Sequence, residues 1–420
     1  MTQPALGLRA NAAQFALLVG LNALVGAMVG LERSVLPLVA KNDFGVSSAA
    51  AVLSFVIAFG IAKAFANLAA GRLADRTGRR RLLAAGWLLA LPVPVLIGVA
   101  PSWGYVVTAN VFLGASQGLA WSMTVVMKID LAGPARRGVA LGLNETAGYL
   151  GVAATAFFTG ALAASVAPRT LIWTIGAGLA AAGLAATLLL VRDTSPHVAA
   201  EHGQAAARRT PQRSLLLACW QAGLVNNLND ALAWGLAPLY LSAHGADATE
   251  IGVVAAVYPA VWGAGQLGGG WLSDWIGRKI PIVTGMLAQS AALGLLVGSS
   301  GAFAPAVGAA TLLGLGTALA YPTLIAGVSD AVSPRARARA VGVYRFWRDT
   351  GFVVGGVLAG VVAETLGFGA AIVLVAGVTA ASGVWVLLTR WPRPIAGADI
   401  AYGEIRRDRN AAVSYPSREG

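Results

Sequence analysis

Residues 71–81 read GRLADRTGRRR, and residues 270–279 read GWLSDWIGRK, which repeats the same pattern 199 positions later. Both copies contain Gly, Asp, Gly and Arg at identical spacing, and both lie between long apolar segments. A polar cluster that occurs twice in this setting indicates a duplicated chain. The repeated residues are Gly71, Asp75, Gly78 and Arg79, then Gly270, Asp274, Gly277 and Arg278.

A second pair of matching stretches supports the duplication. Residues 130–142 read DLAGPARRGVALG, and residues 330–342 read DAVSPRARARAVG, at an offset of 200. Asp130 corresponds to Asp330 in this alignment. Because two separate clusters share nearly the same offset, we interpret the chain as two homologous halves.

The composition predicts a protein embedded in a lipid bilayer. Of the 420 residues, 57% are hydrophobic and 11% are charged, and the mean hydropathy is +0.70. Soluble domains have about 25% charged residues. A membrane-spanning helix needs about 20 mainly apolar residues. Twelve such segments are expected, at 14–38, 48–70, 82–100, 103–127, 139–164, 169–191, 214–241, 249–270, 281–300, 303–327, 340–364 and 367–390.

The basic residues predict the orientation in the plasma membrane. With both termini in the cytoplasm, the loops and tails on that side contain 24 Lys and Arg, Lys128 among them, against Lys41 and Arg169 on the other side. Cytoplasmic loops are enriched in Lys and Arg. This bias explains the net charge of +12 without a nucleic-acid partner. The predicted units are an N-terminal bundle 1–191, a flexible cytoplasmic linker 192–213, a C-terminal bundle 214–390 and a cytoplasmic tail 391–420.

Several chemistries are not expected from this sequence. Cys219 is the only cysteine and the chain has three histidines, so we expect no metal site, no cofactor and no enzymatic activity. The chain lacks GxxxxGK[ST], the phosphate loop of ATP-driven transporters. The stretch GAGQLG at 263–268 lies in an apolar segment, where small residues favour close helix packing and not dinucleotide binding.

The stretch GRLADRTGRRR resembles the signature between the second and third spans of the major facilitator superfamily, and GWLSDWIGRK resembles its weaker copy between spans eight and nine. The resemblance covers residues 14–390. It implies an all-α membrane protein with twelve transmembrane helices in two six-helix bundles that rock around a central site. We expect a monomer. The drug-efflux branch of the family often has an arginine where this chain has Gly114, which weakens a drug-antiporter assignment.

The repeated cluster predicts a cytoplasmic gate. Gly71 and Gly270 would end a helix and allow another backbone to approach. Asp75 or Asp274 could hold the positive end of a neighbouring helix. The flanking arginines could bridge to acidic residues at the ends of neighbouring helices, for which Asp130 and Asp330 are candidates. The alternative is that the arginines only set the topology. The expected gate residues are Gly71, Asp75, Gly78, Arg79, Asp130, Gly270, Asp274, Gly277, Arg278 and Asp330.

Eight ionisable residues within the predicted spans define a candidate substrate and proton pathway. At about 2.5–3.5 kcal/mol each, eight charges facing lipid would cost roughly 20–28 kcal/mol. They should therefore face the interior or one another. The alternative is a closed ion-pair network with no ligand. The residues are Glu32, Arg33, Lys63, Glu145, Asp230, Arg345, Arg348 and Asp349.

Two expectations follow for individual side chains. Arg345 and Asp349 are four residues apart and could pair, which would leave Arg348 for Glu32, Glu145 or an anionic substrate. No cation lies near Asp230 on its own helix, so a raised pKa would suit it to carry protons, with Glu145 as the other candidate. Alternatively, Asp230 only accepts a hydrogen bond from a neighbouring helix.

These patterns predict a gradient-driven transporter in which proton coupling drives export of a small organic compound. An alternative within transport is an inorganic or organic anion clamped by Arg345 and Arg348, because arginine binds anions with two parallel hydrogen bonds. A membrane sensor or scaffold that transports nothing is the alternative from a different class. It predicts that neutralising Asp230 or Glu145 leaves function intact.

Overall fold

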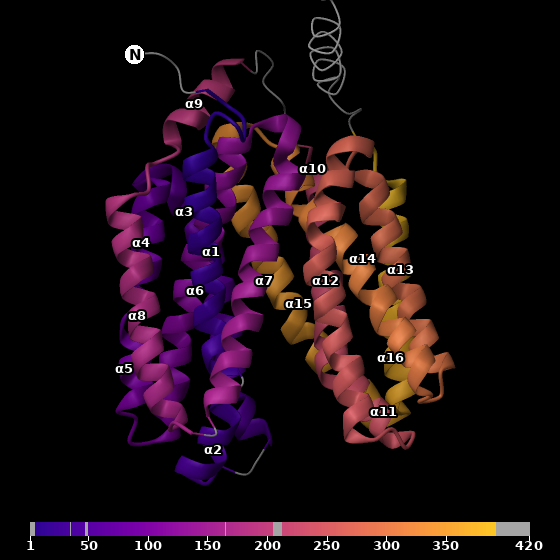
Figure 1. Cartoon of the computed structure of the whole chain (residues 1–420). Coiled ribbons are helices and arrows are strands. Elements are labelled where there is room, and N and C mark those ends of the chain that lie inside the picture. Colours follow the sequence, from indigo (N-terminus) through magenta and orange to yellow (C-terminus); the bar gives the residue numbers. More distant parts are fainter. Residues whose placement is uncertain (1–4, 34, 47–48, 164, 205–211, 392–420) are drawn as a thin grey trace, which may run out of the picture.

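The computed structural model describes residues 5–33, 35–46, 49–163, 165–204 and 212–391. Within these ranges every regular element is a helix, and the long helices run side by side in two groups (Figure 1). The expected all-α fold with two bundles is confirmed. Apart from residue 391, the predicted tail lies outside the described residues.

The N-terminal half contains six helical rods. The first is α1 followed by α2, and the third is α4 followed by α5, whose start is fixed by Pro92. The helices are α1 (Ala12–Arg33), α2 (Leu36–Phe44), α3 (Ala49–Thr77), α4 (Arg79–Ala90), α5 (Pro92–Gly98), α6 (Trp103–Ala132), α7 (Arg137–Leu162) and α8 (Pro168–Leu189).

The C-terminal half repeats this arrangement. Its first rod consists of α10, a π-helical turn at Leu232–Leu236 and α11, and five further rods follow, so the described residues form twelve rods in total. The helices are α10 (Arg213–Ala231), α11 (Ala237–Ala243), α12 (Ala248–Ile276), α13 (Lys279–Gly298), α14 (Phe303–Asp330), α15 (Arg337–Leu366) and α16 (Phe368–Leu388).

Eight helical segments of the described chain are individually long and apolar enough to span a membrane. The other four rods are built on α6, α7, α10 and α12. They carry buried polar side chains, such as Gln117, Asn144, Asn226 and Gln266, which lower their hydropathy. These polar rods contribute much of the surface on which the functional residues lie.

The packing follows the sequence repeat. In the N-terminal half α3 packs on α6 and α1 on α7, and in the other half α12 packs on α14 and α10 on α15. The two halves meet mainly where α3 contacts α15 and where α7 contacts α12 (Figure 1). The repeat places α3 and α12 in equivalent positions, so the interface consists of two related seams.

Glycines bring the backbones close together where the seams meet. A Cβ atom on Gly71 would lie 2.8 Å from the Cα of Gly342, and one on Gly270 would lie 2.2 Å from the carbonyl oxygen of Gly138. The predicted close approach is confirmed. The prediction that Gly71 and Gly270 end their helices is wrong, since α3 and α12 continue beyond them.

The breaks in these helices occur at the second glycine of each repeat. Gly78 has φ 86° and Gly277 has φ 88°, left-handed values that favour glycine and end α3 and α12. The linker was predicted to be flexible, but residues Ser195–Gln204 form helix α9 at the same end of the molecule (Figure 1). We call this end, which holds residues 71–81, 270–279 and α9, the basic end.

Candidate functional site

Six of the eight predicted pathway residues meet between the two halves. We call Lys63, Glu145, Asp230, Arg345, Arg348 and Asp349 the central charged cluster; each is linked to another member by an ion pair of 4.0 Å or less. Glu32 is buried within the N-terminal half, where Asn110 of α6 donates a hydrogen bond of 3.0 Å to it. Arg33 ends α1, and its side chain lies outside the described part of the structure.

Asp230 has a cationic partner on another helix. Arg348 of α15 lies 3.3 Å from its carboxylate, and the Tyr258 hydroxyl of α12 donates to its other oxygen. Asp230 was expected to lack a partner because no cation lies near it in sequence. That expectation is wrong, because the tertiary fold brings α15 against α10. The same guanidinium lies 4.1 Å from the centre of the Tyr321 ring.

Asp349 joins the two halves at the level of this pair. The Asn67 amide of α3 donates a hydrogen bond of 2.6 Å to it, and the Lys63 ammonium lies 4.0 Å away. Arg348 lies 3.4 Å from its other oxygen. Asp349 is therefore contacted from both halves, and its contacts depend on their relative position.

Arg345 faces Glu145 of the opposite half. The two charged groups are 3.9 Å apart, whereas no ion pair forms between Arg345 and Asp349 in the described residues. The expected Arg345–Asp349 pair is wrong because Asn67 and Arg348 already occupy the Asp349 carboxylate. Glu145 accepts hydrogen bonds of 3.0 Å from the Trp121 indole and 2.9 Å from the neighbouring amide of Asn144.

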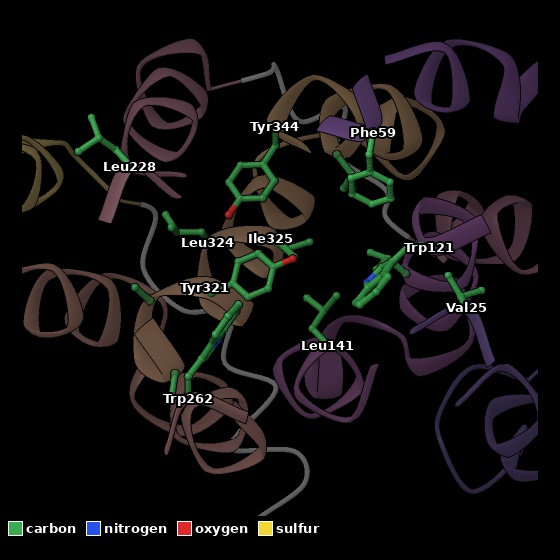
Figure 2. Close-up of a cluster of buried hydrophobic side chains, with 14 of the residues drawn as sticks. Val25, Phe59, Trp121, Leu141, Leu228, Trp262, Tyr321, Leu324, Ile325 and Tyr344 are labelled. Atoms are coloured by element: carbon green, nitrogen blue, oxygen red, sulfur yellow. The ribbon is translucent and has the colours of Figure 1, made fainter. Parts of the chain in front are cut away.

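Aromatic rings from both halves surround the central charged cluster, and Figure 2 shows Trp121, Trp262, Tyr321 and Tyr344 around the same space. Tyr149 of α7 forms the link between halves, with its ring centre 5.6 Å from Trp121 and 4.3 Å from Trp262. The ring of Trp262 also lies 6.1 Å from that of Tyr321. The centre of the interface is thus both charged and aromatic.

Sequence reasoning missed the role of Lys128. It was counted among the loop cations, but its side chain is fully buried in α6 and its ammonium donates a hydrogen bond of 2.5 Å to Asn144. No carboxylate pairs with it among the described residues. Because Asn144 also donates to Glu145, Lys128 is connected to the central charged cluster by one amide. The apolar residues on either side of Lys128 in the sequence could have indicated that its side chain is buried.

The first gate cluster is centred on Asp130 at the basic end. Its carboxylate lies 3.0 Å from Arg79 of the same half and 3.0 Å from Arg337 of the other half. Thr194 donates a third hydrogen bond of 2.9 Å. Arg79 also binds Asp75, at 2.9 Å, and the side chain of Asp75 is 38% exposed. The predicted bridge from the repeat arginine to Asp130 is confirmed.

The second gate cluster is centred on Asp330 and is more extensive. Arg278 lies 3.0 Å from Asp330 and 2.6 Å from Asp274, and Arg137 of the other half also binds Asp330. Asp274 accepts hydrogen bonds from the backbone N–H groups of Gly138, at 2.8 Å, and Val139, at 2.9 Å. These are unpaired donors of the first turn of α7, so the prediction that Asp274 holds a helix end is confirmed. Within the described residues, Asp75 accepts a hydrogen bond from Arg79 and makes no bond to a helix end.

Glu201 of α9 connects the two gate clusters and was not predicted. Its carboxylate accepts hydrogen bonds from both Arg137 and Arg337, which occupy equivalent positions in the two halves. Burial raises the pKa of Glu201, but Arg337 and Arg137 outweigh that effect and hold the pKa below its ordinary value. The linker therefore carries a charged group that joins the two halves at the basic end. Its polar sequence gave no sign of this.

The contacts between the halves are concentrated toward the basic end. The described hydrogen bonds and ion pairs that join them lie at the level of Asp349 and Thr146, or nearer to the gate clusters. In Figure 1 the halves lie closest together near α9 and diverge toward α2 and α11. This arrangement is a state in which the basic end is closed.

Two homologous helical bundles with a charged centre between them, joined by ion pairs at one end, have the architecture of a secondary transporter. The family model of the Major Facilitator Superfamily matches residues 13–222 and again residues 219–411. The chain belongs to this superfamily.

Known proteins agree with this family. An uncharacterised MFS-type transporter of Salmonella typhimurium (strain LT2) is 25% identical over 360 residues, which cover 81% of this chain and 87% of that protein. Among solved structures, the proton:xylose symporter XylE has a TM-score of 0.74 at 13% identity over 90% of this chain and 96% of its own. The human organic anion transporter MFSD10 has a TM-score of 0.72 at 16% sequence identity, and the match covers 89% of this chain and 99% of that protein. The transporter FucP in an outward conformation has a TM-score of 0.73 at 15% sequence identity, and the match covers 90% of this chain and 99% of that protein.

Proposed function

We propose that this chain is a proton-coupled transporter that exports a small organic compound across the plasma membrane by alternating access. It acts as a monomer, with the basic end in the cytoplasm. The proposed units are the bundles 1–191 and 214–390, the linker 192–213 and the tail 391–420. Substrate and protons share the central charged cluster, and the two gate clusters close the cytoplasmic side.

The observation that supports proton coupling is the arrangement of Asp230, Arg348 and Asp349. Asp230 is buried and binds Arg348, which also binds Asp349, and Asp349 is held by Asn67 of the other half. Protonation of Asp230 removes the charge that attracts Arg348. The guanidinium is then free to move toward Asp349, where it competes with the contacts from α3. A proton on one half thereby alters the contact between the halves.

A second candidate is the transport of an anion clamped by Arg345 and Arg348 together. Arg348 is already shared between two carboxylates, which argues against a clamp formed by both arginines. Arg345 has one ion pair, at 3.9 Å, and this observation favours anion binding at Arg345 alone. An organic anion fits export, because a membrane potential that is negative inside favours its outward movement by about 2.3 kcal/mol per charge per 100 mV.

The experiment is a flux assay on the purified full-length chain in liposomes that contain a pH-sensitive dye. Candidate compounds are added to one side, and compound-dependent proton movement is recorded. We expect Asp230→Asn to abolish this movement. The matched control is Asp247→Asn, since Asp247 caps α12 at the surface and asparagine can also cap a helix. Unaltered proton movement in Asp230→Asn would contradict the proposal.

A further inference from the structure

Arg345 is a buried cation that does not use its hydrogen-bonding capacity. Its side chain is 3% exposed, and its Nε and Nη1 atoms have no hydrogen-bond partner among the described residues. The nearest carboxylate oxygen, on Glu145, lies 3.9 Å from Nη1, which is too far for a hydrogen bond. Buried arginines are normally satisfied by protein groups, water or a ligand. Arg345 therefore has donors available for a ligand.

Other unpaired donors lie in the same interface. The Trp262 indole N–H, the Tyr344 hydroxyl and the Nε of Arg348 are buried and have no hydrogen-bond partner within the described chain. Figure 2 shows Trp262 and Tyr344 on either side of Tyr321, whose ring contacts Arg348. On the facing surface one oxygen of Glu145 is unpaired. Donors thus outnumber acceptors, which favours a ligand that supplies acceptor oxygens.

Aromatic side chains make up the apolar part of the interface around these unpaired donors. Trp121 and Tyr149 come from the N-terminal half, and Trp262 and Tyr321 come from the C-terminal half. Tyr149 and Trp262 form the contact between them, at 4.3 Å. Aromatic rings pack edge to face or offset at about 4.5–7 Å. When the halves separate, each of these two rings loses its partner, and a flat ring of a ligand can replace it.

From these observations we infer that the central site binds a small aromatic carboxylate. The carboxylate accepts two hydrogen bonds from Arg345, and the ring packs between the Trp121–Tyr149 pair and the Trp262–Tyr321 pair. Arginine and carboxylate form strong paired hydrogen bonds. An inorganic anion could satisfy Arg345 but would leave the aromatic surface without a partner. This inference rests on the proposed function, since the compound would be the cargo of the proposed transporter.

The test compares three probes of similar size on the purified full-length chain in detergent. Benzoate has both a ring and a charge, cyclohexanecarboxylate has the charge without the aromatic ring, and benzamide has the ring without the charge. Calorimetric titration should give a dissociation constant for benzoate at least about tenfold lower than for either of the others, the equivalent of about 1.4 kcal/mol. This comparison needs no variant, so a misfolded mutant cannot obscure it.

Variants then test the role of Arg345. Arg345→Gln should weaken benzoate binding at least about tenfold, and Arg345→Lys should weaken it less, because lysine keeps the charge but loses the paired geometry. Arg339→Gln is the matched control, since Arg339 is an exposed arginine on the same helix. It should bind benzoate like the unaltered chain.

Each outcome has a distinct meaning. Equal binding of benzamide and benzoate, or full binding by Arg345→Gln, would overturn the assignment of Arg345. Equal binding of cyclohexanecarboxylate would overturn the aromatic part, and no binding of benzoate would overturn the inference as a whole. Proton movement driven by some other compound and abolished by Asp230→Asn would then leave the proposed function standing.

Discussion

Glu201 and Arg337 are joined by two hydrogen bonds of 2.7 Å, one to each carboxylate oxygen, although Glu201 belongs to the linker helix and Arg337 begins α15. The same carboxylate also binds Arg137 at the start of α7. One acidic residue outside the bundles therefore pairs with the first residues of two equivalent helices, one in each half. The two halves are thus bridged at the basic end by a segment that belongs to neither repeat.

Removing the charge of Glu201 should favour opening of the basic end. Glu201→Gln leaves Arg137 and Arg337 close together with one carboxylate fewer, and breaking a buried ion pair costs about 3–5 kcal/mol. Spin labels at Arg81 and Lys279 would report the distance between the halves at this end. We expect the distance distribution to shift to longer values. Glu364→Gln, an exposed site at the far end of α15, should leave the distribution unchanged.

Methyl groups at the glycine contacts should prevent closure. A Cβ on Gly270 would lie 2.2 Å from the Gly138 carbonyl oxygen, and backbone atoms cannot easily move aside. Gly270→Ala should therefore destabilise the closed state by about 1–3 kcal/mol. Gly268→Ala on the same helix is the control, because its Cβ would meet nothing within 4 Å. Equal spin-label distances in the two variants would show that the contact has no role in closure.

The two repeat aspartates should differ in importance. Asp274 accepts two backbone N–H bonds and one from Arg278, and hydrogen bonds to charged groups contribute about 1.5–3 kcal/mol each. Asp75 is partly exposed and binds Arg79, an interaction worth about 0–1 kcal/mol at a surface. Thermal unfolding should show a larger loss of stability for Asp274→Ala than for Asp75→Ala. The reverse order would mean that the second gate cluster is not the stronger one.

The linker should make stability depend on pH near neutrality. Burial lowers the pKa of His197 below its ordinary value of 6.5, although Asp130 acts in the opposite direction. The unfolded chain then binds this proton more readily than the folded one, so stability falls as the pH drops below about 6.5. His197→Gln should reduce this pH slope of the unfolding temperature. His244→Gln, an exposed histidine at the other end, should retain it; an unchanged slope in His197→Gln would refute the assignment.

The sequence predicted the architecture and half of each gate cluster correctly. Repeats at a constant offset and apolar segments of sufficient length depend only on local pattern, so the two bundles and the pairs Arg79–Asp130 and Arg278–Asp330 could be anticipated. The glycine contacts were anticipated too. Their position inside α3 and α12 was not, because a membrane helix can contain glycine where another helix packs against it.

The pairing within the central charged cluster could not be predicted in the same way. Spacing along one helix favoured an ion pair between Arg345 and Asp349. In the folded chain, Asn67 instead donates a hydrogen bond to Asp349, and Arg348 forms an ion pair with Asp230. Such choices depend on which helices face each other and how far each is rotated. Lys128 illustrates a related limit. A cation near a predicted loop is counted as a cytoplasmic loop residue, and only the structure shows that its side chain is buried inside the bundle.

The difference between Asp75 and Asp274 implies an order in the opening of the basic end. Because Asp274 accepts two backbone hydrogen bonds from α7 and Thr146 donates a third to α12, the described residues of the α7–α12 seam share three hydrogen bonds, against one in the α3–α15 seam. The α3–α15 seam should part first, so that the bundles swing apart about an axis near α7 and α12. The first water to reach the centre from that side would then meet Asn67, Lys63 and Asp349, the same contacts that the proton on Asp230 is proposed to loosen.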